Sequence, residues 1–132
     1  CCKVFSEKAG SRESLNMSPR KDTIDWDDFA KIDLRVGTIV KAELFPEARN
    51  PAIKVWVDFG TPIGTLKSSA QITDLYSPEA LVGRQVVGVT NFAPKQIGPF
   101  MSECLITGVV GESQGVVLLT PDREVQNGGS IA

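Results

Sequence analysis

Apolar and polar residues alternate along two stretches of the chain, as they do in β-strands that bury one face. In residues 34–44 the apolar face of the predicted strand carries Leu34, Val36, Thr38, Val40, Ala42 and Leu44. In residues 53–59 it carries Ile53, Val55, Val57 and Phe59. A period of two predicts half-buried strands in both stretches. Gly37, inside the first strand, predicts a bend or a bulge of the kind that a small barrel needs.

Two short helices are predicted from their capping residues. Asp25 suits an N-cap, and Asp27 and Asp28 follow in the first turn, where the helix dipole favours anions. The second helix is delimited by Ser77 as N-cap, proline at the next position, and Gly83 at its end. The acidic residues near Asp25 are therefore interpreted as helix capping rather than as a pair of catalytic acids.

Further strands are predicted over residues 65–72, 85–91 and 101–110, and residues 116–120 return beside the last of them. Five or six short strands, with a small helix between the third and the fourth, match the plan of an OB-fold. The predicted fold class is therefore all-β: a five-stranded Greek-key barrel with a short N-terminal helix.

The chain divides into a tail and one domain. Residues 1–23 are polar and without periodicity, whereas residues 24–132 hold every predicted element and no linker. Met17 is followed by Ser18 and Pro19, which is typical of a translation start, so residues 1–16 are expected to be an upstream extension; a genuine N-terminal arm is the alternative. The first residues lack the apolar segment of a secretory signal. No stretch approaches the ~18 apolar residues that span a bilayer, so we expect no membrane insertion.

The composition argues against most enzyme chemistry. Histidine is absent, which removes Ser-His-Asp and Cys-His catalysis and histidine-based zinc sites. Cys104 stands alone in an apolar strand, where we expect a buried and unreactive thiol. We therefore expect no catalytic activity, no cofactor and no metal. Three cysteines, two of them adjacent, do not make a disulfide framework, and a reducing cytoplasm is the expected compartment.

The net charge bears on nucleic-acid binding. It is −2, with a pI of about 5.1. Residues 1–16 carry +1, from three cations and two acids, so the rest of the chain carries −3. Sequence-independent nucleic-acid binding relies on clustered Lys and Arg, so this domain could bind nucleic acid only if its few cations converge on one face.

One segment offers apolar residues where a polar connection is expected. Residues 91–103 contain two prolines and a glycine, together with Lys95, Ile97 and Phe100. A stiff loop that presents a cation and two large apolar groups is typical of a binding edge. The alternative is that Ile97 and Phe100 plug the end of the barrel.

Separated motifs along residues 24–132 resemble one known family. Residues 29–39 read FAKIDLRVGTI, residues 68–72 read SSAQI, residues 76–84 read YSPEALVGR and residues 91–95 read NFAPK. In this order they resemble the tRNA-binding OB domain, which occurs free-standing and in the C-terminal part of some methionyl-tRNA synthetases. The family strand that usually reads Ser-Glu-Gly-Met reads Ser102, Glu103, Cys104 and Leu105 here. In this respect the chain resembles the CsaA-like secretion chaperones.

The resemblance carries expectations about function. It implies a non-catalytic, export-related chaperone that binds unfolded or preprotein polypeptides as a homodimer, with the secretion machinery as a further partner. A tRNA-binding module that recognises tRNA by shape and backbone is the alternative. Two aromatic residues on a helix too short to bury both indicate that Trp26 and Phe29 lie in the dimer interface.

The candidate site follows from the OB-fold, in which ligands lie across strands two and three. Trp56 on the outer face is either a platform for a ligand or a dimer contact. Asn91 can pair with a peptide group or hold its loop shut, and the second role is favoured. Arg84 is interpreted as a solvated surface charge. The predicted peptide- or RNA-binding residues are Lys54, Trp56, Lys67, Ser68, Ser69, Gln71, Asn91, Lys95, Ile97, Phe100 and Ser102.

Overall fold

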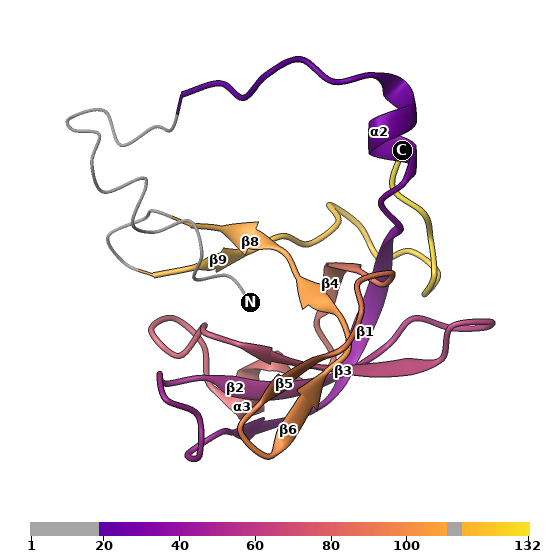
Figure 1. Ribbon diagram of the computed structural model, residues 1–132. Helices are drawn as coiled ribbons and strands as arrows, with labels where there is room; N and C mark the ends of the chain where they lie inside the picture. The colour runs from indigo at the N-terminus through magenta and orange to yellow at the C-terminus, as the bar shows by residue number, and fades with distance from the viewer. Residues whose placement is uncertain (1–18, 111–114) are drawn as a thin grey trace.

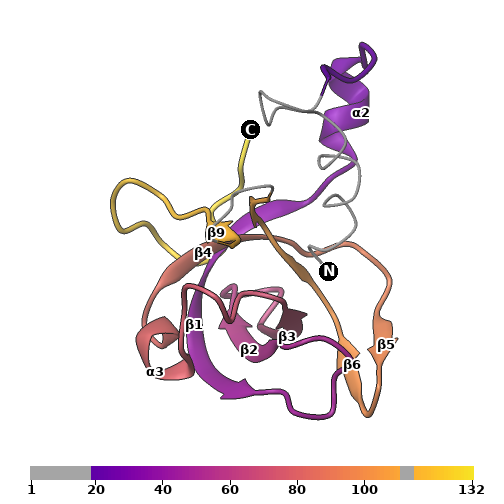
Figure 2. The same cartoon turned by 90° about the vertical axis from the view of Figure 1, so that its left-hand side faces the viewer.

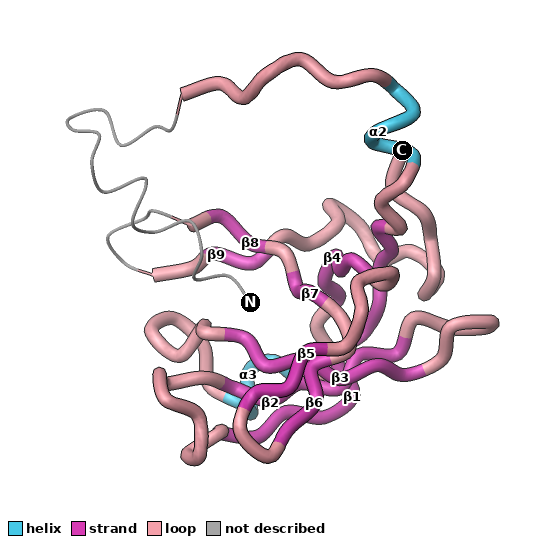
Figure 3. Tube along the Cα trace, in the orientation of Figure 1, coloured by secondary structure: helices cyan, strands magenta, loops and turns pink. Residues whose placement is uncertain are grey.

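The computed structural model describes residues 19–110 and 115–132 (Figures 1 and 3). The expected extension before Met17 lies outside these residues. In chain order the elements are α2 (Trp26–Ala30), β1 (Leu34–Leu44), β2 (Ile53–Asp58), β3 (Thr65–Ala70), α3 (Pro78–Leu81), β4 (Gln85–Val89), β5 (Lys95–Ile97), β6 (Phe100–Ser102), β7 (Leu105–Ile106), β8 (Gly108–Val109) and β9 (Val117–Leu118). Both helices begin at the predicted N-caps, Asp25 and Ser77.

The main sheet is antiparallel and has the strand order β3-β2-β1-β4-β7. It curls until its ends almost meet, and the segment after β6 bridges them. The backbone N–H of Glu103 donates to the carbonyl oxygen of Lys67 in β3 at 2.7 Å. The result is a nearly closed five-stranded barrel, which confirms the predicted OB-fold.

Strand β1 departs from the predicted alternation. Its first part pairs with β4 and its second part with β2 (Figure 2). The register of the pairing with β2 shifts between Ile39 and Lys41. Because of this bulge Ile39 is buried, whereas Val40 is 49% exposed. The prediction that Val40 and Leu44 face the core was therefore wrong. Gly37 packs directly against the ring of Phe59. A Cβ at this position would approach within 2.8 Å of Phe59 Cδ1, so a side chain does not fit.

The core lies between the strands and under α3. Strand β2 and the residue after it follow the predicted alternation, with Ile53, Val55, Val57 and Phe59 fully buried. Leu81 of α3 packs into the same cluster, as does Cys104. Burial raises the pKa of the Cys104 thiol to about 12. The thiol therefore stays protonated at neutral pH, in agreement with the unreactive role that the sequence indicated.

The C-terminal part of the chain differs most from the predicted elements. The segment interpreted as a loop contains a hairpin, β5–β6, whose turn begins at Gly98 with a φ of 56°. Glycine adopts this positive φ without steric cost. The predicted strand over residues 101–110 is divided among β6, β7 and β8, which pair with different partners. Residues 128–131 run along β1 and exchange backbone hydrogen bonds with Leu34 and Val36.

Candidate binding site

The outer face of β2 and β3 gathers several of the predicted site residues. In the antiparallel register Lys54 lies opposite Ser69, and Trp56 lies opposite Lys67. Directly opposed residues project from the same face of a sheet, so these four side chains share the outer face. Ser68 does not, because it lies opposite Val55 and is fully buried toward the barrel interior. The prediction that Ser68 is available to a ligand was wrong.

Phe100 covers part of this face. The hairpin β5–β6 folds over β3 (Figure 1). Phe100 is only 8% exposed. Its ring centroid lies 5.4 Å from that of Phe45 and 6.0 Å from that of Trp56. The Nζ atoms of Lys54 and Lys67 lie 5.7 Å and 5.1 Å from the Phe100 centroid. The expectation that Phe100 is exposed was therefore wrong: the ring is the centre of a second small core. Ile97 is half-buried at its edge.

Ser102 and Glu103 close the barrel. The backbone N–H of Ser69 donates to Ser102 Oγ at 3.3 Å, and that hydroxyl lies 3.4 Å from Ser68 Oγ. Glu103 Oε1 accepts from the backbone N–H of Lys67 at 3.1 Å. Ser102 is buried in these contacts. Ser102 was predicted to contact a ligand, but its hydroxyl instead has a structural role, because it joins β3 to the segment after β6.

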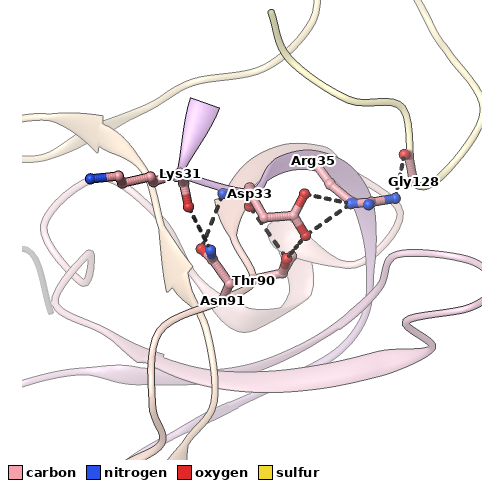
Figure 4. Close-up of polar contacts among 6 residues, drawn as sticks. All are labelled: Lys31, Asp33, Arg35, Thr90, Asn91 and Gly128. Atoms are coloured by element: carbon pink, nitrogen blue, oxygen red, sulfur yellow. Dashed lines mark hydrogen bonds and ion pairs between the residues drawn. The ribbon is translucent and has the colours of Figure 1, made fainter. Parts of the chain in front are cut away.

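Asn91 holds the loop after β4 against the start of β1 (Figure 4). Its Nδ2 donates to the carbonyl oxygen of Lys31 at 2.7 Å, and its Oδ1 accepts from the backbone N–H of Asp33 at 3.0 Å. Both ends of the amide are thus used within the chain, as the favoured structural interpretation requires. The neighbouring Phe92 is 57% exposed, so the loop offers a different phenylalanine to solvent from the one the sequence indicated.

Asp33 is the centre of a polar cluster in the same figure (Figure 4). Its carboxylate accepts from the hydroxyl of Thr90 and from Arg35 Nε, the latter at 2.9 Å. Arg35 Nη1 also donates to the carbonyl oxygen of Gly128 at 3.4 Å. The cluster therefore ties β1, the end of β4 and the C-terminal segment together. The hydrogen bond from Thr90, opposed in part by burial and assisted by Arg35, lowers the pKa of Asp33.

The lowered pKa of Asp33 predicts a pH-dependent contribution to stability. A depressed folded-state pKa stabilises the fold above the unfolded-state value of about 4, and the contribution is lost as pH falls through the folded-state pKa. We expect Asp33→Asn to lower the free energy of unfolding at pH 7 by about 1 kcal/mol, since the carboxylate is partly exposed. The difference from the unaltered protein should shrink below pH ~4. Urea unfolding at a series of pH values measures it, with Asp122→Asn, at an exposed surface pair, as control.

A pocket of about 230 Å³ remains open beside the covered face. The loop between β1 and β2, the end of β3 and strand β5 form its walls. Of the predicted residues it brings together Ser69, Gln71, Lys95 and Ile97. Arg49 and Asn50, which the sequence did not indicate, line it as well. Residues 45–51 could be identified only as a loop, because nothing local shows which part of the barrel such a loop approaches.

The cations are only partly gathered. Lys41 lies 4.7 Å from the Trp56 ring and so joins Lys54 and Lys67 on the outer face. Glu43 offsets two of these charges, with its carboxylate oxygens 3.3 Å from Lys41 Nζ and 3.6 Å from Lys54 Nζ. Arg84 lies elsewhere, over the ring of Tyr76 beside α3.

Helix α2 projects from the barrel (Figures 1 and 2). Trp26 is 90% exposed and Phe29 half-buried. Between the helix and the C-terminal segment runs a mostly apolar groove of about 710 Å³. Its lining residues are Trp26, Phe29, Ala30, Ile32, Asp33, Leu34, Ser130, Ile131 and Ala132. Among the residues that the structure describes, no helix is long and apolar enough to cross a membrane.

Solved structures resemble this barrel closely. The chaperone CsaA of Bacillus anthracis is 49% identical, with a TM-score of 0.79 over 84% of this chain and 100% of the other. The CsaA chaperone protein of Picrophilus torridus is 45% identical, also with a TM-score of 0.79, over 83% of this chain and 100% of the other. A MetRS-related protein of Pyrococcus horikoshii is 28% identical, with a TM-score of 0.75, over 85% of this chain and all of its own.

Similar sequences include longer enzymes. The methionine–tRNA ligase of Flavobacterium johnsoniae is 32% identical over 96% of this chain, but the match spans only 17% of the ligase. The chain thus corresponds to less than a fifth of these relatives. The family model described as "Putative tRNA binding domain" matches residues 34–130, which include the whole barrel. These matches confirm the resemblance seen in the sequence, and the chain belongs to the tRNA-binding domain family.

Proposed function

We propose that this chain is a non-catalytic module that binds unfolded or export-destined polypeptides as a homodimer. The observation that carries the proposal is the open pocket at the edge of β3, in a barrel that a CsaA chaperone matches over its full length at 49% identity. Such a module would act in the cytoplasm and pass its clients to the secretion machinery.

The lining of the pocket suits a polypeptide backbone. Asn50 and Gln71 carry side-chain amides, which can both donate to and accept from peptide groups. Ala48, Ala52 and Ile97 add apolar surface for small side chains. A site that pairs with peptide groups and offers shallow apolar contact can take many sequences, as a chaperone requires.

The groove beside α2 supports the proposal of a homodimer. Trp26 is almost fully exposed although it is the largest apolar side chain on the helix, and exposed aromatic clusters of this kind favour protein interfaces. A second copy would supply a second pocket. Two pockets on one dimer raise the avidity for a long unfolded chain without any new contact.

The second candidate function is tRNA binding, and one observation favours it. Lys41, Lys54 and Lys67 lie on one face together with aromatic rings, a combination that suits a nucleic-acid backbone and its bases. Against it, Glu43 pairs with two of these lysines, Arg84 lies elsewhere, and the net charge is negative. We therefore favour the polypeptide.

A salt titration separates the two candidates. We expect the affinity for an unfolded polypeptide without acidic side chains and with an amidated C-terminus to change less than about twofold between 50 and 200 mM salt, because burial of apolar groups is not screened. Binding of tRNA through several phosphates would weaken by roughly tenfold or more over that range. Fluorescence anisotropy with each labelled ligand gives both curves. A steep loss of tRNA affinity with no measurable polypeptide binding would overturn the preferred function.

A further inference from the structure

The pocket beside β3 has a pronounced charge asymmetry. Two cations, Arg49 and Lys95, line it, and no acidic side chain does. Within residues 19–110 and 115–132 neither cation makes an ion pair. This differs from the outer face of β2, where Glu43 offsets Lys41 and Lys54. The pocket is therefore positive in a chain whose net charge is negative.

Ser69 provides a second and independent observation. It lines the pocket, is 3% exposed, and its register opposite Lys54 places its side chain on the outer face. Its backbone N–H donates to Ser102 Oγ, but its own hydroxyl has no hydrogen-bond partner in the described part of the chain. A buried hydroxyl without a partner costs free energy, so this one is expected to donate to a ligand.

We propose that this pocket binds a carboxylate of the client polypeptide, with Arg49 and Lys95 supplying charge and the Ser69 hydroxyl a hydrogen bond. This rests on the proposed function. The carboxylate comes from an Asp or Glu side chain or from a free C-terminus, which share this chemistry. Ala48 and Ala52 offer apolar contact to the adjoining methylene groups or to a small neighbouring side chain. The amides of Gln71 and Asn50 remain for the flanking peptide groups.

A carboxylate fits the pocket better than the phosphates of a nucleic acid. Phosphates recur along a strand, and binding them needs a row of cations. Here the two unpaired cations share one small pocket, and the neighbouring Lys54 is already paired with Glu43. Arginine also binds a planar carboxylate through two parallel hydrogen bonds. The site thus discriminates among clients by one acidic group, while the rest of the contact tolerates many sequences.

The test compares matched peptides by isothermal titration calorimetry. Three peptides share one extended sequence: one carries Glu at its centre and an amidated C-terminus, one carries Gln there with the same amide, and one carries Gln with a free C-terminus. We expect at least one of the two carboxylate-bearing peptides to bind about tenfold more tightly than the neutral one, the scale of one charge-assisted hydrogen bond. Which of them does so identifies the source of the carboxylate.

The variants assign this preference to the pocket. Arg49→Ala with Lys95→Ala should remove it, whereas Arg84→Ala with Arg123→Ala, which changes the net charge equally outside the pocket, should leave it intact. Ser69→Ala should reduce the preference without lowering the melting temperature, because its hydroxyl has no partner to lose.

Four results would count against the proposal. Equal binding of all three peptides overturns the carboxylate pocket but leaves the proposed function standing. A preference that survives in Arg49→Ala with Lys95→Ala does the same. No binding of any peptide overturns both. If a single-stranded oligonucleotide binds and the pocket variant alone abolishes that binding, the pocket takes phosphate instead.

Discussion

Phe100→Ala is expected to lower the free energy of unfolding by about 3–5 kcal/mol, the usual cost of removing a buried phenylalanine. The ring fills the space between Phe45 and Trp56, and two lysine ammonium groups lie over it. Its removal would leave a cavity in the second core and take the cation–π contacts of both lysines with it. Urea unfolding at fixed protein concentration measures the loss.

The same hairpin region supplies a matched control. Phe92 lies in the loop between β4 and β5, just before the hairpin, and is 57% exposed. Phe92→Ala should therefore change the unfolding free energy by less than ~0.5 kcal/mol. If Phe100→Ala unfolded at the same urea concentration as Phe92→Ala and instead lost polypeptide binding, Phe100 would be a ligand contact after all, and its packing against Phe45 and Trp56 would contribute little.

This pair of phenylalanines shows where reasoning from the sequence reaches its limit. Both lie in a segment rich in proline and glycine, and local pattern gives both the same environment. Phe100 contacts Phe45 and Trp56, which are remote in the sequence, whereas Phe92 is exposed. Ser102 is similar, since only closure of the barrel brings it to Ser68 and Ser69.

Where the determining interactions are local, the sequence predicted the structure well. The strict alternation of β2 and the N-caps of both helices depend on neighbouring residues only. Strand β1 depends on both local pattern and contacts between remote segments. Its alternation is as regular in sequence as that of β2, but the bulge near Val40 arises because the strand must pair with β4 and then with β2. The pocket could not be predicted from local pattern, because three segments that are separate in the sequence form it.

Phe29→Ala is expected to weaken the proposed homodimer by about 2–4 kcal/mol, the scale of an aromatic anchor at an interface. This corresponds to roughly 30- to 1000-fold in the dissociation constant. The residue lines the apolar groove beside α2 and is half-buried in the single chain, so its loss should cost association more than folding. Trp26→Ala should act in the same direction, because Trp26 is exposed unless a second copy covers it.

Sedimentation equilibrium over a range of concentrations gives the dissociation constant, and far-UV circular dichroism checks that each variant is folded. Leu44→Ala is the control, since Leu44 is an exposed apolar residue outside the groove and its loss should leave association unchanged. A chain that sediments as a monomer at micromolar concentration would contradict the homodimer itself. A dimer that Phe29→Ala and Trp26→Ala leave intact would place the interface on another face of the barrel, and the groove beside α2 would then have a different occupant.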